Sequence, residues 1–233
     1  MNVMNATISA DIISSTSLSS SQLMAVVGEV RALFQQIEKQ LNDREMLFWG
    51  RIVKGDAMEC YLKEPHYALR IALLLKTTVL TALVKYNENP NSVLFAKYGV
   101  RMAIGIGDMR IVDKTKDIMD GTAIYLSGRK IAEQTTSGKQ KNIVKRTLYF
   151  ACQDALLEQQ MNVYLLFVDQ LLRMATTRQI QVLQQKLMGN TDKLVAMNLS
   201  LNSASTVNQH CTTLGWNAIE GLLNYYEKKL YPL

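Results

Sequence analysis

Apolar and polar residues alternate with a period of two in several short segments of this chain. Such alternation is typical of strands that bury one face. The predicted strands cover residues 4–11, 46–53, 57–62, 100–106, 109–112 and 147–151. The turn Lys54-Gly55-Asp56 joins two of them into a hairpin, and we expect the strand at 109–112 to pair back onto the one before it.

Other segments carry apolar residues at steps of three and four, which predicts helices. A serine-rich turn over 14–21 can cap a helix that runs to about Leu41. Pro65 begins a second helix, which the polar segment 87–91 ends, and a third covers about 122–134. The order β-α-β-β-α-β predicts an α+β, ferredoxin-like fold, with a sheet of antiparallel type and its helices on one face.

The last third of the chain has the pattern of an all-α region. The predicted helices cover 154–175, with a break near 160–162, and then 178–188, 191–198, 203–214 and 216–230. The pair 191–198 and 203–213, with its tight connection, resembles a helix-turn-helix. These patterns predict a first domain over 1–152, a connecting helix over 153–175 and a helix-turn-helix domain over 176–233.

Composition is that of an ordinary packed protein, with 233 residues, 48% hydrophobic and 20% charged. The three cysteines are widely spaced, which argues against a disulfide framework or a zinc site and favours a reducing cytoplasm. The N-terminus does not have the pattern of a signal peptide, and no stretch approaches the length of a membrane span. We therefore expect a cytoplasmic protein with no membrane partner.

The net charge of +6 is confined to the first two thirds of the chain, since residues 151–233 contain six basic and six acidic residues. Part of the excess is a basic cluster over 139–146. This cluster could neutralise phosphates, or it could be a solvated loop, which is the commoner role of short basic runs.

Two aspartates are the strongest candidates for chemistry. Asp11 and Asp56 each stand where an alternating run ends or restarts, so their carboxylates would lie at the edge of a sheet. Mg²⁺ is commonly held by one or two carboxylates together with substrate phosphates. The residues Ser14, Ser15 and Thr16, with free backbone N–H groups entering a helix, would form a phosphate cradle. Alternatively, Asp11 caps a turn and Asp56 belongs only to the hairpin.

Four segments in this order, SADIISST, VKGDAMECYL, VRMAIGIGDMR and DGTAIYLSGRKIAE, resemble a class III nucleotide cyclase homology domain over residues 4–151. With the C-terminal helices, the whole chain is similar to SatD-like regulatory proteins, which join such a domain to a helix-turn-helix. The resemblance implies that Asp11 and Asp56 hold two metal ions, Mg²⁺ or Mn²⁺. It also implies a homodimer, because cyclase-homology domains pair.

The chain departs from the cyclase pattern in the residues that position the substrate. In the cyclase motif Gly-x-x-x-Asn-x-x-x-Arg, Tyr125 stands in place of the asparagine and Arg129 is kept as a vestigial phosphate-stabilising residue. Ile52 stands in place of the base-reading lysine, for which Lys54 could substitute. The loss of ribose positioning predicts a catalytically weak or silent domain that binds a nucleotide or another phosphorylated ligand. The predicted ligand contacts are Ile12, Ser14, Ser15, Thr16, Lys54, Tyr125 and Arg129.

The helix over 203–214 has polar outward positions that could read base edges in double-stranded DNA. These positions are Ser203, Ser205, Thr206, Asn208, Gln209 and Thr212. The helix has no Lys or Arg, although phosphate neutralisation normally dominates DNA affinity, so a protein-docking module is the alternative. Three functions therefore stay open: a ligand-sensing transcriptional regulator, an active cyclase, and a non-catalytic dimerisation scaffold.

Overall fold

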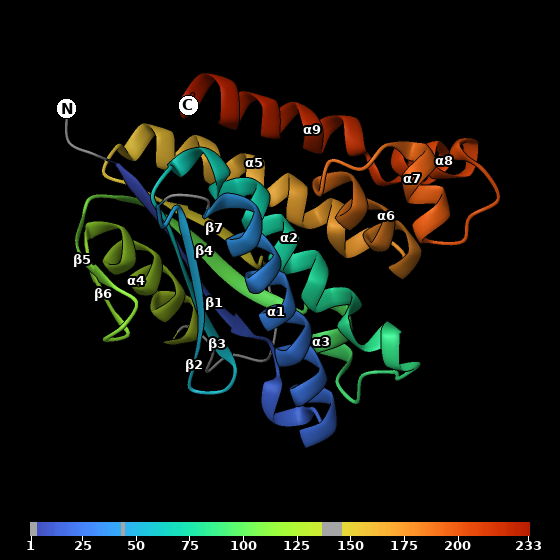
Figure 1. The fold of residues 1–233 in the computed structure, drawn as a ribbon, viewed down its shortest axis with the longest axis horizontal. Helices are drawn as coiled ribbons and strands as arrows, with labels where there is room; N and C mark the ends of the chain where they lie inside the picture. Colours follow the sequence, from blue (N-terminus) through green and yellow to red (C-terminus); the bar gives the residue numbers. More distant parts are fainter. Residues whose placement is uncertain (1–3, 43–44, 137–145) are drawn as a thin grey trace.

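A five-stranded sheet forms the centre of the protein, in the strand order β2-β3-β1-β4-β7 (Figure 1). The computed structural model describes residues 4–42, 45–136 and 146–233. The strands of this sheet are β1 (Asn5–Ile12), β2 (Phe48–Val53), β3 (Ala57–Leu62), β4 (Val100–Gly107) and β7 (Leu148–Ala151). Neighbours pair antiparallel except β7, which is parallel to β4. The predicted element order is confirmed, but the sheet is mixed rather than wholly antiparallel.

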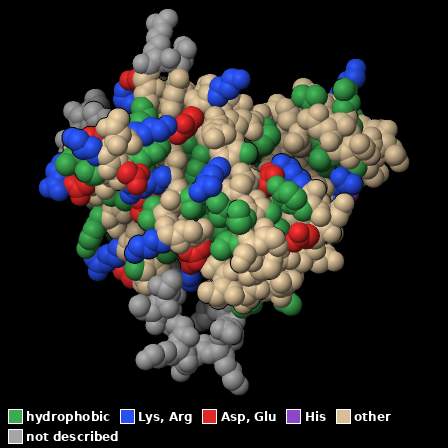
Figure 2. Space-filling view, turned by 60° about the horizontal axis from the view of Figure 1, so that its bottom comes forward, with side chains coloured by type: hydrophobic (Ala, Val, Ile, Leu, Met, Phe, Trp, Pro, Cys, Tyr) green, Lys and Arg blue, Asp and Glu red, His purple; other side chains and the backbone are tan. Residues whose placement is uncertain are grey.

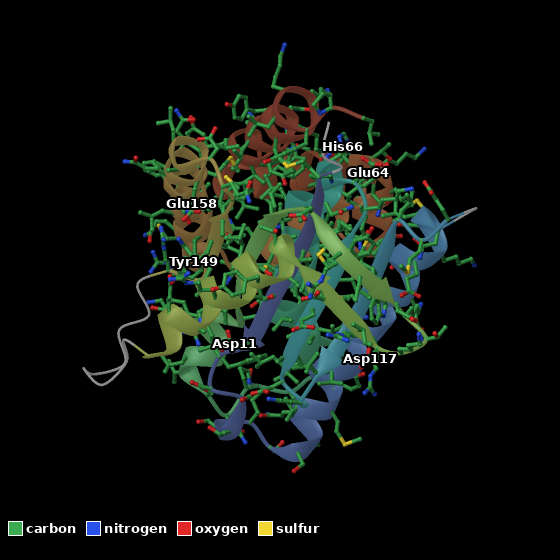
Figure 3. All side chains as sticks on the ribbon, turned by 90° about the vertical axis from the view of Figure 1, so that its left-hand side faces the viewer. Asp11, Glu64, His66, Asp117, Tyr149 and Glu158 are labelled. Atoms are coloured by element: carbon green, nitrogen blue, oxygen red, sulfur yellow. The ribbon has the colours of Figure 1, made fainter. Side chains whose placement is uncertain are left out.

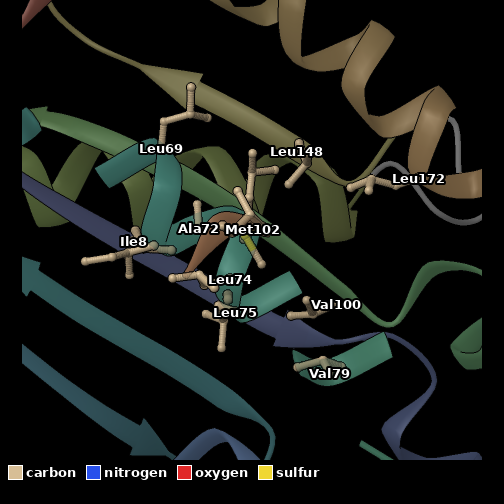
Figure 4. Close-up of a cluster of buried hydrophobic side chains, with 14 of the residues drawn as sticks. Ile8, Leu69, Ala72, Leu74, Leu75, Val79, Val100, Met102, Leu148 and Leu172 are labelled. Atoms are coloured by element: carbon tan, nitrogen blue, oxygen red, sulfur yellow. The ribbon is translucent and has the colours of Figure 1, made fainter. Parts of the chain in front are cut away.

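Helices α1 (Ser20–Leu41) and α2 (Ala68–Thr81) cover one face of the sheet. The even-numbered residues of β1 point to this face, where Ile8 is fully buried, and α2 supplies aliphatic side chains over β1 and β4 (Figure 4). Gly50 of β2 leaves room for the ring of Phe34 from α1. This face carries the apolar half of the alternation, so its burial follows directly from the sequence pattern.

Helix α4 (Thr122–Thr136) lies on the opposite face, so the expectation that all helices share one face is wrong. The odd-numbered residues of β1 face α4, and the hydroxyls of Thr7 and Ser9 both hydrogen-bond to that of Ser127, at 2.9 and 2.8 Å. Gly105 of β4 lets the backbone of α4 approach closely. A polar sheet face can be covered in this way because its hydroxyl groups find partners on the covering helix.

Strand β5 (Met109–Asp113) pairs with β6 (Ile118–Gly121) and not with β4, which corrects the predicted pairing. Both edges of β4 are already taken by β1 and β7, so the nearest available partner is the next segment of the chain. The resulting hairpin is held at the β2 side, where Arg51 pairs with Asp117 and Lys114 pairs with Glu38 of α1.

The helix predicted from Pro65 is divided into a 3-10 turn, α2 and a second 3-10 turn at Ala82–Tyr86, and the short α3 (Val93–Tyr98) was not predicted. The continuous helical stretch Pro65–Tyr86 is long and apolar enough to cross a membrane, contrary to the expectation that no stretch approaches that length. However, 78% of its most apolar window is buried inside the protein, as in a core helix.

The C-terminal part of the chain is helical, as predicted. Its elements are α5 (Ala155–Met174), α6 (Thr177–Leu187), α7 (Asp192–Asn198), α8 (Ala204–Leu214), α9 (Trp216–Tyr225) and the π-helical turn Tyr226–Leu230. The predicted break near 160–162 is wrong, because Asn162 is buried within a continuous α5 and its side chain hydrogen-bonds both backbone groups of Phe150. Helix α6 packs along α2, and one cluster of buried apolar residues contains side chains from both parts of the chain. The domain boundary at 152/153 stays a prediction.

Candidate functional site

Asp11 and Asp56 lie at the same end of two neighbouring strands. Asp11 stands near the end of β1, directly opposite Ala57 of β3 and Arg101 of β4. Asp56 precedes Ala57 in the hairpin turn, and its backbone carbonyl accepts a hydrogen bond from the N–H of Ile12 at 3.1 Å. In Figure 3, Asp11 lies at the lower end of the sheet, far from His66 at the upper end. The sheet therefore brings the backbones of the two predicted metal ligands side by side.

The carboxylate of Asp11 is held by a guanidinium group. Nε and Nη2 of Arg101 donate to Oδ1 and Oδ2 of Asp11 at 3.1 and 2.7 Å, a bidentate pair. The hydrogen bond to Asp11 is the main cause that raises the pKa of Arg101, and burial opposes it. The side chains are 19% and 25% exposed, so solvent reaches the pair. Both oxygens of Asp11 thus already have a cationic partner.

Asp56 is bound by a hydroxyl group. Ser15 Oγ donates to Asp56 Oδ2 at 2.6 Å. Ser15 begins a short 3-10 turn that ends at Ser17, and Ser14 before it has a left-handed backbone with φ of 54°. Only one oxygen of Asp56 is used by this hydrogen bond, so the other is available to a ligand.

The predicted phosphate cradle over Ser14, Ser15 and Thr16 lies before α1 rather than at its first turn. The serine-rich turn caps α1 as predicted, since Ser19 is its N-cap, but the helix begins only at Ser20, after the 3-10 turn Ser15–Ser17. Thr16 is exposed on the intervening turn. The side chain of Ile12 is buried in the core, and its N–H is used by Asp56. Among the predicted hydroxyl contacts, Ser15 is therefore the one that hydrogen-bonds to a predicted metal ligand, Asp56.

Lys54 lies in the turn beside Asp56 and is exposed. Strand β2 ends at Val53, and Lys54 has a left-handed backbone with φ of 55°. The argument that Lys54 shares the strand face of Ile52 is therefore wrong, because the strand does not extend to residue 54.

Tyr125 and Arg129 point away from the sheet. Ser127 faces β1, so residues two positions before and after it lie on the outer side of α4. The side chain of Arg129 is 63% exposed, and Tyr125 is 63% exposed. The hydrogen bond to Glu133 at 3.0 Å is the main cause that raises the pKa of Arg129. Within the described residues, the contacts of Arg129 are with Glu133 and Tyr125, and none reaches an aspartate.

The fit of a metal ion to this site depends on Arg101. No group of three or more His, Cys, Asp and Glu side chains that could hold a metal occurs among residues 4–42, 45–136 and 146–233. Mg²⁺ needs only one or two carboxylates when phosphates and water complete its shell. Asp56 meets this requirement as it stands, and Asp11 meets it once Arg101 leaves its oxygens.

No protein-family model matches this chain, and no curated protein matches it. Among solved structures it is similar to two described as bacterial light-regulated adenylyl cyclases. One is 15% identical, with a TM-score of 0.41, over 64% of this chain and 76% of that one. The other is 16% identical, with a TM-score of 0.40, over 64% of this chain and 42% of the other. This likeness concerns the mixed α+β arrangement and carries no assignment of residues.

The candidate DNA-reading residues lie on α8 and at its N-cap, Ser203, at the end of the molecule remote from β5 and β6 (Figure 1). Val207, Cys211 and Leu214 are the buried residues of α8, whereas the opposite side is open to solvent. The exposed candidates are Ser203, Ser205, Asn208, Gln209 and Thr212, and Thr206 is half-buried. Ser203 Oγ accepts from the Thr206 N–H at 3.3 Å, so the hydroxyl of Ser203 serves as the helix cap.

Arg101 is the residue of this site that the sequence patterns missed. It lies in one of the four motif segments, on a strand position that alternates with apolar neighbours. Its partner depends on the register between β1 and β4, strands that are far apart in the sequence. A signal was present, since a lone arginine in a strand that is otherwise apolar needs a partner for its charge.

Proposed function

We propose that the sheet end formed by Asp11, Asp56, Ser15 and Arg101 binds the phosphates of a nucleotide together with Mg²⁺ or Mn²⁺, and does so without converting the nucleotide. The observation that carries this proposal is the bidentate pair between Arg101 and Asp11. It places a good phosphate ligand beside a good metal ligand at a partly exposed position.

The ion pair is a plausible resting state for such a site. The planar fork of a guanidinium group matches phosphate as well as carboxylate. A divalent ion would replace the guanidinium group at Asp11, while a phosphate oxygen would replace the carboxylate at Arg101. Each protein charge then keeps a partner of opposite sign, so opening the pair does not leave a charge unpaired. Asp56 would share the metal ion, and Ser15 orients its carboxylate.

The absence of turnover in this proposal follows from Tyr125, which stands where the cyclase motif has its asparagine. Cyclisation requires the ribose to be fixed and a cation at the developing phosphorane charge. A tyrosine side chain does not reproduce the donor and acceptor of an amide. Loss of a positioning contact costs a factor of about a hundred in rate, so binding with little or no chemistry is the expected behaviour.

Thermal unfolding tests this proposal. With Mn²⁺ and a nucleoside triphosphate at about 100 times its Kd, binding to the folded state should add about 2.7 kcal/mol to the free energy of unfolding. Asp56→Asn keeps the acceptor for Ser15 but removes a metal ligand, so the added stability should be lost. Asp120→Asn, in the β5–β6 hairpin, is the matched control, because Asp120 pairs with Arg110 outside the proposed site. If none of the four nucleoside triphosphates raises the melting temperature at millimolar concentration, the binding proposal is wrong. If the protein forms a cyclic nucleotide and Asp11→Ala abolishes that product, the proposal that it does not convert the nucleotide is wrong.

A second candidate function is DNA-binding transcription regulation in a homodimer, in which nucleotide and metal bias how two copies of α8 are presented. The specific observation is that α8 has one open polar face at the extremity of the molecule. Charge weakens this candidate. In Figure 2 the basic and acidic side chains gather over the sheet half on the left, while the right-hand half shows few charges. The basic cluster over 139–145 lies outside the described residues.

Fluorescence anisotropy with labelled duplex DNA separates this candidate from the docking module. A regulator should bind a genomic fragment more tightly than random DNA, and Asn208→Ala with Gln209→Ala should remove that preference. Each lost base contact is worth about 1–3 kcal/mol. Equal binding of both duplexes, or none at about 50 mM salt, would leave α8 as a docking helix.

A further inference from the structure

The outer side of α5 carries few charges, although the helix is 20 residues long and fully described. Its three charged residues all contact other residues of the protein. Glu158 pairs with Lys130, and Asp169 is fully buried against Thr147. Arg173 lies 6.0 Å from the ring centre of Tyr98 and donates a hydrogen bond to Oε1 of Gln170. The exposed residues are Ala155, Leu156, Gln159, Gln160, Val163, Tyr164, Leu166, Phe167, Gln170 and Met174. A solvated helix face normally carries charges, so this face is suited to a partner.

The exposed residues of α5 follow a coiled-coil pattern. Large apolar side chains are open to solvent at four points along the helix: Leu156 is 65% exposed, Val163 47%, Phe167 67% and Met174 75%. With Gln160 and Gln170 between them, the steps are four, three, four, three and four residues. This spacing forms one continuous seam, which a second helix covers in a coiled coil.

We propose that this seam pairs with the same seam of a second copy of the chain, with the two α5 helices antiparallel. The seam reads the same in both directions, since each half contains two apolar residues separated by a glutamine. In the antiparallel arrangement, Leu156 meets Met174 and Val163 meets Phe167 of the second copy. Gln160 meets Gln170, whose Oε1 accepts from Arg173 and whose NH₂ group can donate to Oε1 of Gln160. Such self-complementarity is what a twofold interface requires.

Charge favours a second copy over a charged partner. Each chain carries +6, so two copies approach most easily through a surface that is poor in charge. The residues beside the seam fit this approach: Leu166 meets its own counterpart, and Gln159 meets Arg173 of the second copy, so no like charges are opposed. An acidic or nucleic-acid partner would find few cations here: Arg173 beside Gln170, and Arg146 at the edge of the face, beside Val163 and Leu166.

Size determines how tight this dimer is. A helix of 20 residues is about 30 Å long and about 10 Å wide, so the seam covers roughly 300 Å² per copy. Stable interfaces bury about 800 Å² per partner. Tyr225 of α9, whose ring packs edge-on against Tyr164, extends the apolar surface beyond the seam. We therefore expect a dimer that forms and dissociates at micromolar concentrations. The proposal depends on neither nucleotide nor DNA binding.

Sedimentation velocity of the full chain between about 1 and 100 μM tests the dimer. The wild type should shift from monomer to dimer across this range, and Phe167→Glu should remain a monomer because it buries an unpaired charge in the seam. Val93→Glu, at a position that is 82% exposed on α3, should behave as the wild type. A wild-type monomer at 100 μM, or a Phe167→Glu variant that dimerises like the wild type, would overturn the proposal.

Cysteine cross-linking tests the direction of the helices. Leu166→Cys places a thiol close to the twofold axis of the antiparallel pair, so mild oxidation should link two copies. The native cysteines Cys60, Cys152 and Cys211 are buried, and the wild type should show little linkage. A Leu156→Cys variant is linked only if the helices are parallel. Linkage of Leu156→Cys without linkage of Leu166→Cys would therefore overturn the antiparallel pairing.

Discussion

The buried ion pair of Lys76 and Asp169 connects α2, α3, β4 and α5 through side-chain hydrogen bonds. Lys76 of α2 is 1% exposed, and its Nζ donates to the carbonyls of Tyr98 and Val100, each at 2.9 Å, and to Thr147 Oγ1. Asp169 of α5 accepts from the N–H and the hydroxyl of Thr147 at 2.7 and 2.6 Å, and lies 3.7 Å from Lys76. Every polar atom of this group therefore has a partner, which is the condition for burying charge.

Removing one partner of this pair should be far more costly than removing both. Asp169→Ala leaves the ammonium group of Lys76 buried without a counterion, and we expect a loss of about 3–5 kcal/mol in the free energy of unfolding. The double variant Lys76→Met with Asp169→Leu replaces the pair by apolar side chains and should be much closer to wild type. Urea denaturation measures both. Lys114→Ala, which removes a surface ion pair with Glu38, should change little. A double variant as unstable as Asp169→Ala would contradict this account.

Lys76 should also make the stability of the protein depend on pH. Burial lowers the pKa of Lys76 to about 8, although Asp169 acts in the opposite direction. Between about pH 8 and the ordinary value of 10.5 the unfolded chain binds more protons at this residue than the folded protein, so its contribution to stability rises with pH. Urea denaturation gives the difference in unfolding free energy between wild type and Lys76→Met at pH 7 and at pH 10. From pH 7 to pH 10 this difference should shift by about 1–3 kcal/mol in favour of the wild type. An unchanged difference between the two proteins would contradict the titration.

The contact between α4 and β4 depends on the absence of a side chain at Gly105. A Cβ at this position would overlap the carbonyl oxygen of Ala123 and lie 2.8 Å from the Ser127 nitrogen. Gly105→Ala should therefore push α4 away from the sheet and cost about 1–3 kcal/mol. Gly28→Ala is the matched control, because nothing lies within 4 Å and alanine favours the helix by about 1 kcal/mol. In urea denaturation, Gly105→Ala should lower the free energy of unfolding and Gly28→Ala should raise it. If Gly105→Ala leaves the free energy of unfolding unchanged, α4 adjusts freely to the added methyl group.

The helices and strands with strong periodicity were predictable, and their pairing was predictable only in part. The strand at Ala57–Leu62 was located to the residue by alternation. The prediction that all helices pack on one face left the polar face of β1 without a covering helix, whereas α4 covers the hydroxyls of Thr7 and Ser9 through Ser127. A periodic pattern distinguishes two faces but does not state what covers each one. That depends on contacts between residues more than a hundred positions apart.

For the molecule as a whole, the sequence allowed the two aspartates of the candidate site to be predicted, but not the residues that their side chains contact. The ends of the alternating runs located Asp11 and Asp56, and the structure places their backbones side by side at one end of β1 and β3. The partner of Asp11 could not be predicted, because Arg101 reaches it through strand register. Nor could the outward direction of Arg129, because a sequence motif fixes the order of residues and leaves the rotation of the helix open.

The C-terminal helices should unfold together with the sheet rather than as a separate unit. Helix α6 packs along α2, and Gln184 of α6 donates to the Thr78 hydroxyl at 2.8 Å. Arg70 of α2 makes a bidentate pair with Glu227 near the C-terminus at 2.7 and 2.9 Å. Removing residues 153–233 would expose this side of α2 and leave Lys76 without Asp169, so the truncated chain should be insoluble or largely unfolded.

Calorimetry of the full chain should then give one transition whose calorimetric and van't Hoff enthalpies agree. Arg70→Met, which breaks the contact with Glu227, should lower the midpoint of that single transition and should not produce a second one. If residues 153–233 were an independent domain, two transitions would appear, and Arg70→Met would move them apart. The distinction bears on function, because a single cooperative transition would mean that one packed core connects Asp11 to α8, which is a physical route for coupling between the two.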